Sequence, residues 1–520
     1  MVFSSNVFLL YFMPGFFLLY FLLPKKARNY ALLFASLLFY AWGAPDFLIQ
    51  LVVSTIANFY LVKAMVAAKE TENGTPKGSP TEWEVKRKTE NAAFSKLLCG
   101  LSIAIPIGLL VFYKYANFFT ENLYWLLDRL GYSQFSVLRS PFSKILLPIG
   151  ISFFSFQSVT YTLDTYRGVN QPMKKLSDYM LYITMFPQLI AGPIVRYCDV
   201  ADQIRHRESG YADRLQGFYR FVIGLCKKIL IADVIGMEVD AILGPANLSA
   251  LSAERLATLT ERIAMLDSTT AWMVALAYAF QIYFDFAGYS DMAIGLGRIM
   301  GFKFPENFNN PYVSKSITEF WRRWHITLGA FIKNYLYLPL GGNRKGKART
   351  YLNLWICFLL SGLWHGASWN FVVWGALHGL FICLDKVFNG KQRTENGKFS
   401  VLRSPFSVFF TFLFVTVTWM VFRIEKLDLA WTFIGRMFAF QFAPLPFSLN
   451  PRFYVTLLLA ALFSFITLTK GGRRLQEIVY HREFSDRQHI FVWILSMAAF
   501  LFCIAALNAS RFSPFIYFRF

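Results

Sequence analysis

WMVALAYAFQIYFDFAGYSDMAIGLGRIM, residues 272–300, is apolar along almost its whole length, and its only charged residues are Asp285, Asp291 and Arg298. A helix needs ~20 mostly apolar residues to cross the hydrocarbon core of a bilayer, where every backbone N–H and C=O must be satisfied within the protein. This stretch is long enough for such a span. It therefore predicts an α-helical membrane protein rather than a soluble domain.

The rest of the chain repeats this pattern. Apolar residues make up 56% of the 520 positions and charged residues only 16%, which is too little polar surface for a soluble domain of this length. Further apolar stretches lie at about 7–24, 29–44, 47–68, 97–116, 145–163, 177–195, 216–235, 351–381, 406–422, 453–469 and 490–508. Because some are short or broken by Gly and Pro, we expect one all-α polytopic membrane domain over residues 1–520, with roughly 10–11 crossings plus re-entrant or interfacial helices.

The charges around the first apolar stretch predict the orientation of the chain. No basic residue precedes this stretch, and Lys25, Lys26 and Arg28 follow it. Under the positive-inside rule the N-terminus lies outside and these three residues lie in the cytoplasm. Residues 69–96, which are polar and contain Gly and Pro, then predict a flexible cytoplasmic loop. Residues 237–270 have the apolar spacing of an amphipathic helix that lies on the membrane.

Composition also excludes several classes of function. The net charge of +21 is spread over short linkers between apolar stretches, as in loops that face anionic lipid, and no compact basic domain is present to bind nucleic acid. The six cysteines show no C-x-x-C spacing and the six histidines are scattered, so the pattern does not favour a metal site. We therefore expect neither a bound metal nor a nucleic-acid partner.

A short repeat is present in two linkers. The nonapeptide FSVLRSPFS occurs at 135–143 and again at 399–407, each time before an apolar stretch. Its position predicts an interfacial anchor, with Arg and Phe at the depth of the lipid headgroups. The flanking residues differ, so no longer internal duplication is indicated.

Asp285 and Asp291 raise the question of proton handling, because charge inside a bilayer is costly. They lie six residues apart, which places them about 120° apart around one helix, so they do not share one face well. Hydrogen bonds from neighbouring backbone or Arg groups explain such carboxylates as readily as proton transfer does, and we favour that structural interpretation.

Two histidines fall in segments rich in aromatic residues. His325 follows EFWRRW at 319–324, and His365 lies in SGLWHGASWN at 361–370. Neutral imidazole can accept and return a proton near neutral pH, so each is a candidate base, although a lone buried His is more often structural. His365 and His378 are too far apart along the chain to share a site on an unbroken helix. No G-x-S-x-G elbow is present, so a Ser–His–Asp hydrolase is not supported.

Taken together, these segments resemble the membrane-bound O-acyltransferase (MBOAT) family, and more narrowly its alginate and peptidoglycan O-acetylating branch. WRRWH at 321–325 and GLWHG at 362–366 are similar to the two-histidine signature of that family. Other segments similar to that branch are MVFSSN (1–6), LPIGISF (147–153), AGPI (191–194), YFDFAGYSD (283–291), SITEF (316–320) and SPFIYFRF (513–520). The resemblance is weakest in the loop 69–96 and around 440–489.

The resemblance implies an enzyme, an O-acyltransferase built as a helical membrane bowl. It implies that His365 is the general base that activates the acceptor hydroxyl, or a transient acyl carrier, and that His325 orients donor or acceptor. The expected donor is cytoplasmic acetyl-CoA, a substrate rather than a bound cofactor, whose phosphates the basic loop 344–349 would attract. Tyr517 in the C-terminal motif would carry the acyl group towards an external partner, or serve only as an aromatic interface anchor.

The expected acceptor is an exported polysaccharide such as alginate or peptidoglycan, reached through a periplasmic or extracellular SGNH-type partner. The expected location is the bacterial cytoplasmic (inner) membrane. Two alternatives stay open. One is D-alanyl transfer to teichoic acid, as in a sister branch, and the N- and C-terminal motifs speak against it. The other is a transporter that couples protons to a solute through Asp285, Asp291 and His365, and the absence of a long paired repeat speaks against it.

Overall fold

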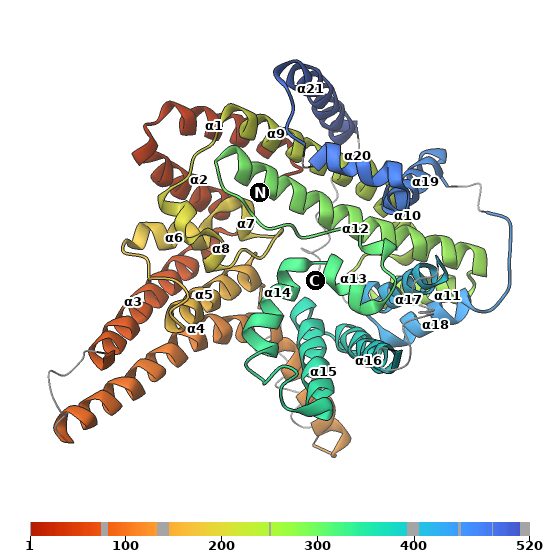
Figure 1. Ribbon diagram of the computed structural model, residues 1–520. Helices are drawn as coiled ribbons and strands as arrows, with labels where there is room; N and C mark the ends of the chain where they lie inside the picture. Colours follow the sequence, from red (N-terminus) through yellow and green to blue (C-terminus); the bar gives the residue numbers. More distant parts are fainter. Residues whose placement is uncertain are drawn as a thin grey trace. The chain divides into compact units, whose positions relative to one another are not determined.

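The computed structural model describes residues 2–73, 82–132, 145–248, 251–392, 405–445, 449–480 and 482–509. All regular elements among these residues are helices, as the sequence predicts (Figure 1). The chain divides into two compact units. The first contains residues 7–208 and 301–304, and the second contains residues 2–6, 209–300 and 305 onwards.

The first unit holds the N-terminal helices. Their bounds are α1 (Met13–Leu22), α2 (Arg28–Gly43), α3 (Leu48–Asn73), α4 (Glu82–Arg129), α5 (Ile151–Tyr166), α6 (Leu176–Thr184), α7 (Phe186–Leu189) and α8 (Tyr197–Arg205). α3 and α4 run side by side as a long hairpin (Figure 1). These two helices extend into the segment predicted as a loop at 69–96, and residues 74–81 between them lie outside the described part of the chain.

Two segments that carry the family resemblance meet in this unit. Gly150 has a φ of 77°, and a Cβ on it would lie 2.6 Å from the carbonyl oxygen of Leu189. Glycine is the residue that satisfies both the left-handed backbone and this close approach. The segment 147–153 therefore packs against the chain that leads into 191–194.

The second unit holds the remaining helices, and α12 lies at its centre. Their bounds are α9 (Tyr211–Cys226), η5 (Lys227–Ala232), α10 (Asp233–Leu243), α11 (Ala253–Ala264), α12 (Ser268–Ile299), α13 (Ile317–Arg323), α14 (Ile326–Ile332), α15 (Gly346–His365), α16 (Trp369–Gln392), α17 (Pro405–Arg423), α18 (Leu427–Met437), α19 (Pro451–Phe465), η10 (Ile466–Leu468), α20 (Lys470–Tyr480) and α21 (Asp486–Ala509). Nearly every residue of α12 is buried, which explains why residues 272–300 show no polar face.

α12 packs on α9 through two pairs of glycines, Gly217 with Gly295 and Gly224 with Gly288. A Cβ on Gly224 would lie 2.4 Å from the carbonyl oxygen of Gly288, and a Cβ on Gly295 would lie 2.6 Å from that of Gly217. The two backbones therefore touch at both pairs, in the manner of small-residue helix contacts in membranes. Even an alanine at these positions would force the helices apart.

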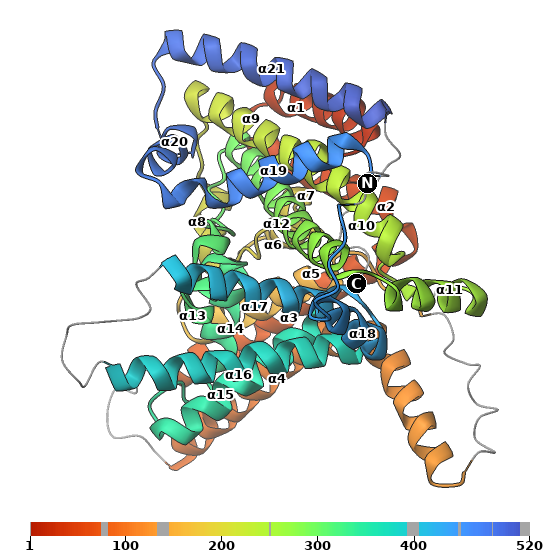
Figure 2. The same ribbon diagram turned by 90° about the vertical axis from the view of Figure 1, so that its right-hand side faces the viewer.

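α15 and α16 form a second tight helix pair (Figure 2). A Cβ on Gly362 would lie 2.3 Å from the carbonyl oxygen of Phe371, and a Cβ on Gly375 would lie 2.5 Å from that of Phe358. Close helix packing beside His365 is therefore made by the glycine three positions before this histidine.

Six described helices are long and apolar enough to cross a membrane, and the bent pair α11–α12 is a seventh candidate. The six cover Pro45–Lys69, Glu90–Arg129, Trp369–Val387, Phe406–Arg423, Pro451–Leu468 and Asp486–Ala509. The other predicted crossings fall on shorter or more polar helices such as α2 and α15. A polytopic helical membrane protein is thus confirmed, and the number of 10–11 crossings stays a prediction.

α11 is the amphipathic helix expected within 237–270. Its Leu259 and Ile263 are buried in the core of the unit, and Leu256 and Leu266 pack partly against the same core. Its interfacial position on the membrane stays a prediction. The repeat at 135–143 and most of its copy at 399–407 lie outside the described residues.

Candidate active site

His325 lies at a break between two short helices. α13 ends at Arg323 and α14 begins at Ile326, and His325 has a φ of 46°, in the left-handed region that L-residues rarely adopt. Its Nδ1 lies 3.0 Å from Asn307 Oδ1, and its ring meets that of Phe286 edge-on at 4.8 Å. The imidazole is buried, and burial lowers the pKa of His325 to about 3. It is therefore neutral at physiological pH.

His365 is the last residue of α15 and is buried among aromatic rings. Its ring centroid lies 4.8 Å from that of Trp364, 5.2 Å from that of Trp374 and 5.2 Å from that of Phe422. The chain leaves the helix at Gly366 and enters α16 at Trp369. The surroundings of His365 are thus largely apolar, which keeps water away from its ring.

The indole of Trp364 brings the two histidines together. Its centroid lies 5.8 Å from that of His325 and 4.8 Å from that of His365. The two histidines singled out in the sequence, forty residues apart, therefore share one neighbour. An arrangement in which two imidazoles flank a buried indole is a candidate site for proton handling.

His378 belongs to the same aromatic cluster but has both ring nitrogens occupied. Trp321 Nε1 donates to His378 Nδ1 at 3.2 Å, and His378 Nε2 lies 3.1 Å from Thr418 Oγ1. Trp374 contacts both His378 and His365, because the helix break after His365 folds α16 back on α15. His378 therefore has a structural role, and within the described part of the chain no group of three or more His, Cys, Asp or Glu residues could hold a metal ion.

Asn370, in the same motif as His365, ties two helices together. Its Nδ2 donates to the carbonyl oxygens of Val421 and Phe422, at 3.2 and 3.1 Å. These bonds hold the start of α16 against the end of α17 and so place the Phe422 ring beside His365. We did not predict this role, because both acceptors are backbone groups remote in sequence.

Asp285 and Asp291 of α12 are each ion-paired with cations of α9 and η5. Asp291 contacts Arg220 and Lys227, both at 2.6 Å, and Asp285 contacts Lys228 at 2.6 Å. Each carboxylate therefore has a cationic partner, which agrees with the structural interpretation of the two residues. The two lysines were not anticipated, because they lie within the apolar stretch 216–235.

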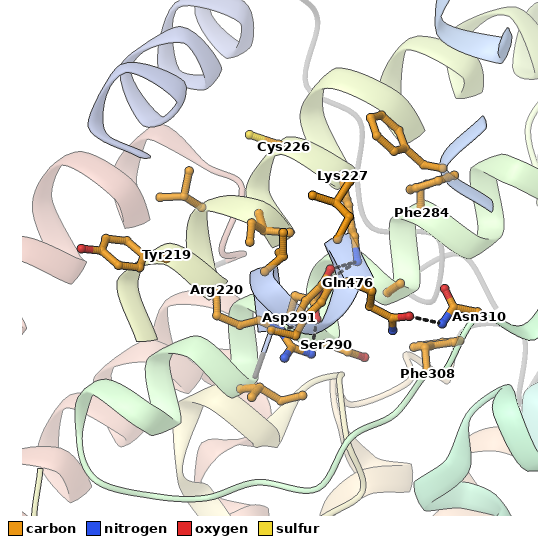
Figure 3. Close-up of a pocket in the computed structure, with 18 of the residues that line it drawn as sticks. Tyr219, Arg220, Cys226, Lys227, Phe284, Ser290, Asp291, Phe308, Asn310 and Gln476 are labelled. Carbon is orange, nitrogen blue, oxygen red and sulfur yellow. Dashed lines mark hydrogen bonds and ion pairs between the residues drawn. The ribbon is translucent and has the colours of Figure 1, made fainter. Parts of the chain in front are cut away.

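A cavity of about 770 Å³ opens beside this ion cluster, between α9, α12, α20 and α21 (Figure 3). Its wall includes Arg220, Lys227 and Asp291, together with apolar side chains of all four helices. The cavity reaches Asn307, the partner of His325, and Ile326, the next residue in the chain. Sequence reasoning missed it, because part of the wall comes from the region around 440–489, where the resemblance is weakest.

The N-terminal segment that carries the resemblance packs on the segment 283–291. The ring of Phe3 stacks on that of Tyr289 with centroids 4.6 Å apart, and Asn6 Nδ2 donates to Asn508 Oδ1 at 2.6 Å. Tyr517, the third predicted site residue, lies outside the described residues. The segment 344–349, predicted as a basic loop, is exposed throughout, and its residues 346–349 form the first turn of α15. Its cations are therefore accessible from solvent.

Comparison with known proteins identifies similar sequences along the whole chain. The sequence profile of the membrane-bound O-acyltransferase family matches residues 34–424. A probable alginate O-acetylase AlgI of Pseudomonas putida is 37% identical over 100% of both chains. A peptidoglycan O-acetyltransferase of Helicobacter pylori is 34% identical over 83% of this chain and 78% of its own length. A teichoic acid D-alanyltransferase of Bacillus subtilis is 28% identical over 45% of this chain and 58% of its own length. These matches confirm the resemblance.

Proposed function

This chain belongs to the membrane-bound O-acyltransferase family, and from that premise we propose that it moves acetyl groups from cytoplasmic acetyl-CoA to an exported polysaccharide such as alginate or peptidoglycan. That it is a membrane acyltransferase follows from the family itself. The donor and the polymer are our inference, and the relatives that O-acetylate alginate and peptidoglycan support it.

The proposal rests on one observation, that the imidazoles of His325 and His365 both contact the indole of Trp364. Transfer from a thioester to an alcohol needs a base, a site that excludes water and room for two substrates. His365 and His325 supply nitrogen bases, and both are buried beside Trp364. Beside this site, the cavity that reaches Asn307 and Ile326 supplies room.

His365 takes the role of general base in this proposal. Its imidazole removes the proton of the acceptor hydroxyl while the oxygen attacks the thioester carbonyl, and the proton then leaves with the departing thiol. His365 can instead carry the acetyl group transiently before the hydroxyl attacks. The rings of Trp364, Trp374 and Phe422 keep water from competing with the acceptor in either route.

The exposed basic loop 344–349 is proposed to attract the phosphates of acetyl-CoA. The proposal thus puts this segment on the cytoplasmic side and, by the positive-inside rule for the charges after the first apolar stretch, puts the N-terminus outside the bacterial inner membrane. An SGNH-type partner outside would then receive the acetyl group for the polymer.

The alternatives are less well supported. The D-alanyltransferase matches less than half of this chain, whereas the alginate O-acetylase matches all of it. Against proton-coupled transport, Asp285 and Asp291 are both held by cations. These ion pairs join α12 to α9 and η5, which gives the two carboxylates a structural role instead.

The test is acetylation of the exported polymer in cells that make wild-type, His365→Ala, His325→Ala or His378→Gln protein at matched membrane levels. We expect His365→Ala to abolish the ester and His325→Ala to reduce it strongly. His378→Gln is the matched control, because His378 is equally buried in the same cluster. Normal acetylation by both His365→Ala and His325→Ala would overturn the proposal.

Tyr517 is proposed as the acyl relay to the external partner. Mass spectrometry of the C-terminal peptide after loading with acetyl-CoA should then find an acetyl ester on this phenol, and Tyr517→Phe protein should fail to acetylate the polymer. A peptide without ester, together with normal acetylation by Tyr517→Phe, would leave Tyr517 as an interface anchor.

A further inference from the structure

Asn307 forms hydrogen bonds with three successive residues, His325, Ile326 and Thr327, where α13 gives way to α14. Its backbone carbonyl accepts from the N–H of Ile326 at 3.0 Å, and its Oδ1 lies 3.0 Å from His325 Nδ1. Thr327 Oγ1 donates to the same Oδ1 at 2.8 Å. Asn307 is fully buried, so these bonds are shielded from water and cost free energy if lost.

The neighbours of Asn307 determine which way its amide faces. The backbone N–H of Thr327 can only donate, and it points at the side-chain oxygen from 3.4 Å. On the other side, Asn307 Nδ2 donates to Ser290 Oγ at 3.0 Å. Rotating the amide by 180° would set Nδ2 against an N–H donor, so Oδ1 is the atom that faces the histidine.

That orientation decides the tautomer of His325. An amide oxygen accepts and cannot donate, so the proton of the neutral imidazole must sit on Nδ1. Nε2 then carries the lone pair. This nitrogen is buried, and within the described part of the chain it has no hydrogen-bond partner. A buried acceptor without a donor is rare in folded proteins and marks a place where a ligand can supply one.

We propose that Asn307 is a positioning residue which holds His325 as the Nδ1–H tautomer, so that Nε2 accepts a hydrogen bond from a donor group of the bound substrates other than the hydroxyl that His365 deprotonates. The inference rests on the proposed function for the identity of those substrates. The tautomer itself follows from the hydrogen-bond network alone. The left-handed backbone at His325 depends on the same residue, because the hydrogen bond from Ile326 N–H to the Asn307 carbonyl holds the backbone in that conformation.

The first readout is the tautomer, measured by ¹⁵N solid-state NMR on histidine-labelled protein in lipid vesicles, with His325→Gln to assign the signal. We expect a protonated Nδ1 and a bare Nε2 in the wild-type protein, and a loss of this preference in Asn307→Ala. A wild-type His325 with a bare Nδ1 would overturn the proposal. This readout needs no enzymatic activity, so it stays valid if the acetyltransfer assay fails and the proposed function falls.

The second readout is the rate of acetyl transfer as a function of pH. Asn307→Ala should lower kcat by about 10–100-fold, the range found when the hydrogen-bond partner that orients a metal-bound histidine is removed. Asn307→Asp should restore most of the rate, since a carboxylate also accepts from Nδ1–H, and should move the acid limb of the profile to higher pH because its charge stabilises the imidazolium.

Thr327→Val is the matched control, because it removes the hydroxyl bond to the same Asn307 oxygen and leaves the backbone N–H and the shape of the side chain. We expect its tautomer to be unchanged and its rate to stay within about threefold of wild type. If Asn307→Ala and Thr327→Val lose the same activity and show the same tautomer, Asn307 is only a packing residue and the proposal is wrong.

Discussion

His325 and His365 contact the same indole, yet their surroundings differ. His325 stands in a left-handed turn and is hydrogen-bonded to the amide of Asn307. His365 ends a helix and lies among the rings of Trp374 and Phe422. A hydrogen bond specifies which nitrogen carries a proton, whereas ring contacts specify position and exclude water. The comparison therefore separates two requirements of the site, a defined tautomer at His325 and a dry aromatic wall beside His365.

The strongest test of this comparison is Gly362→Val, beside His365. The new side chain would overlap the carbonyl oxygen of Phe371, since even a Cβ would lie 2.3 Å from it. We expect a loss of more than about 3 kcal/mol in the free energy of unfolding, above the usual cost of overpacking because the obstacle is backbone. The measurement is the yield of folded protein by size-exclusion chromatography in detergent.

Gly329→Ala in α14, near His325, is the matched control. A Cβ there would meet only Trp321 O at 3.7 Å, an ordinary contact. Alanine should therefore raise the stability by about 0.5–1 kcal/mol through its better helix propensity. An equal yield of folded Gly362→Val and wild-type protein would show that α15 and α16 pack less tightly than the structure indicates.

The next largest effect is expected at Trp364, which connects the two histidines. Trp364→Ala removes the ring on which both imidazoles pack, and we expect acetyl transfer to fall on the order of a hundredfold, as small displacements of reacting groups do. Trp364→Phe keeps a ring and should lose about tenfold or less. Initial rates of acetyl transfer at matched protein levels measure this difference. Equal rates for Trp364→Ala and Trp364→Phe would show that no ring is needed at this position to hold the two histidines.

The pH dependence of stability tests the polar side of the comparison. The pKa of His325 is lowered to about 3 in the folded protein, against about 6.5 in an unfolded chain. As the pH falls below about 6.5, His325 binds a proton in the unfolded chain but stays neutral in the folded protein. The free energy of unfolding therefore falls by up to about 1.4 kcal/mol per pH unit. Unfolding of wild-type and His325→Gln protein at pH 7 and pH 5 measures this difference. Identical pH dependence would show that His325 is not buried as a neutral ring.

The smallest effect is expected at His378, the histidine whose two nitrogens are already occupied. Glutamine can still accept from Trp321 Nε1, so His378→Gln should cost about 1 kcal/mol of stability, the worth of one hydrogen bond. Its acetyl transfer should stay within about twofold of wild type. A loss as large as that of His365→Ala would move His378 into the reacting site.

The helical membrane class was predictable from sequence, because span length and apolar content are properties of the chain itself. The roles of His325 and His365 came from the family resemblance and stay predictions, and the structure adds that both rings contact Trp364. The break at Trp324 and His325 was not predictable, since no Gly or Pro stands there and the turn depends on Asn307, which precedes it by eighteen positions. The partners of the two aspartates were hidden for a related reason. Lys227 and Lys228 lie in an apolar stretch, and only the packing of α9 on α12 brings them to the carboxylates.

The cavity could not be predicted from the sequence, for a different reason. Its wall combines residues from α9, α12, α20 and α21, and no local pattern marks residues that converge from such distances. The prediction for Tyr517 rests on a motif alone, and the experiments above address it directly.

The two glycine pairs between α9 and α12 have a consequence for how this sequence can drift over evolution. On each helix the two glycines are spaced by seven residues, Gly217 and Gly224 on one and Gly288 and Gly295 on the other. Because each glycine meets backbone on the opposite helix, no compensating change elsewhere can make room for a larger residue. A saturation mutagenesis map should therefore show four intolerant positions with this spacing, at which even alanine is rejected.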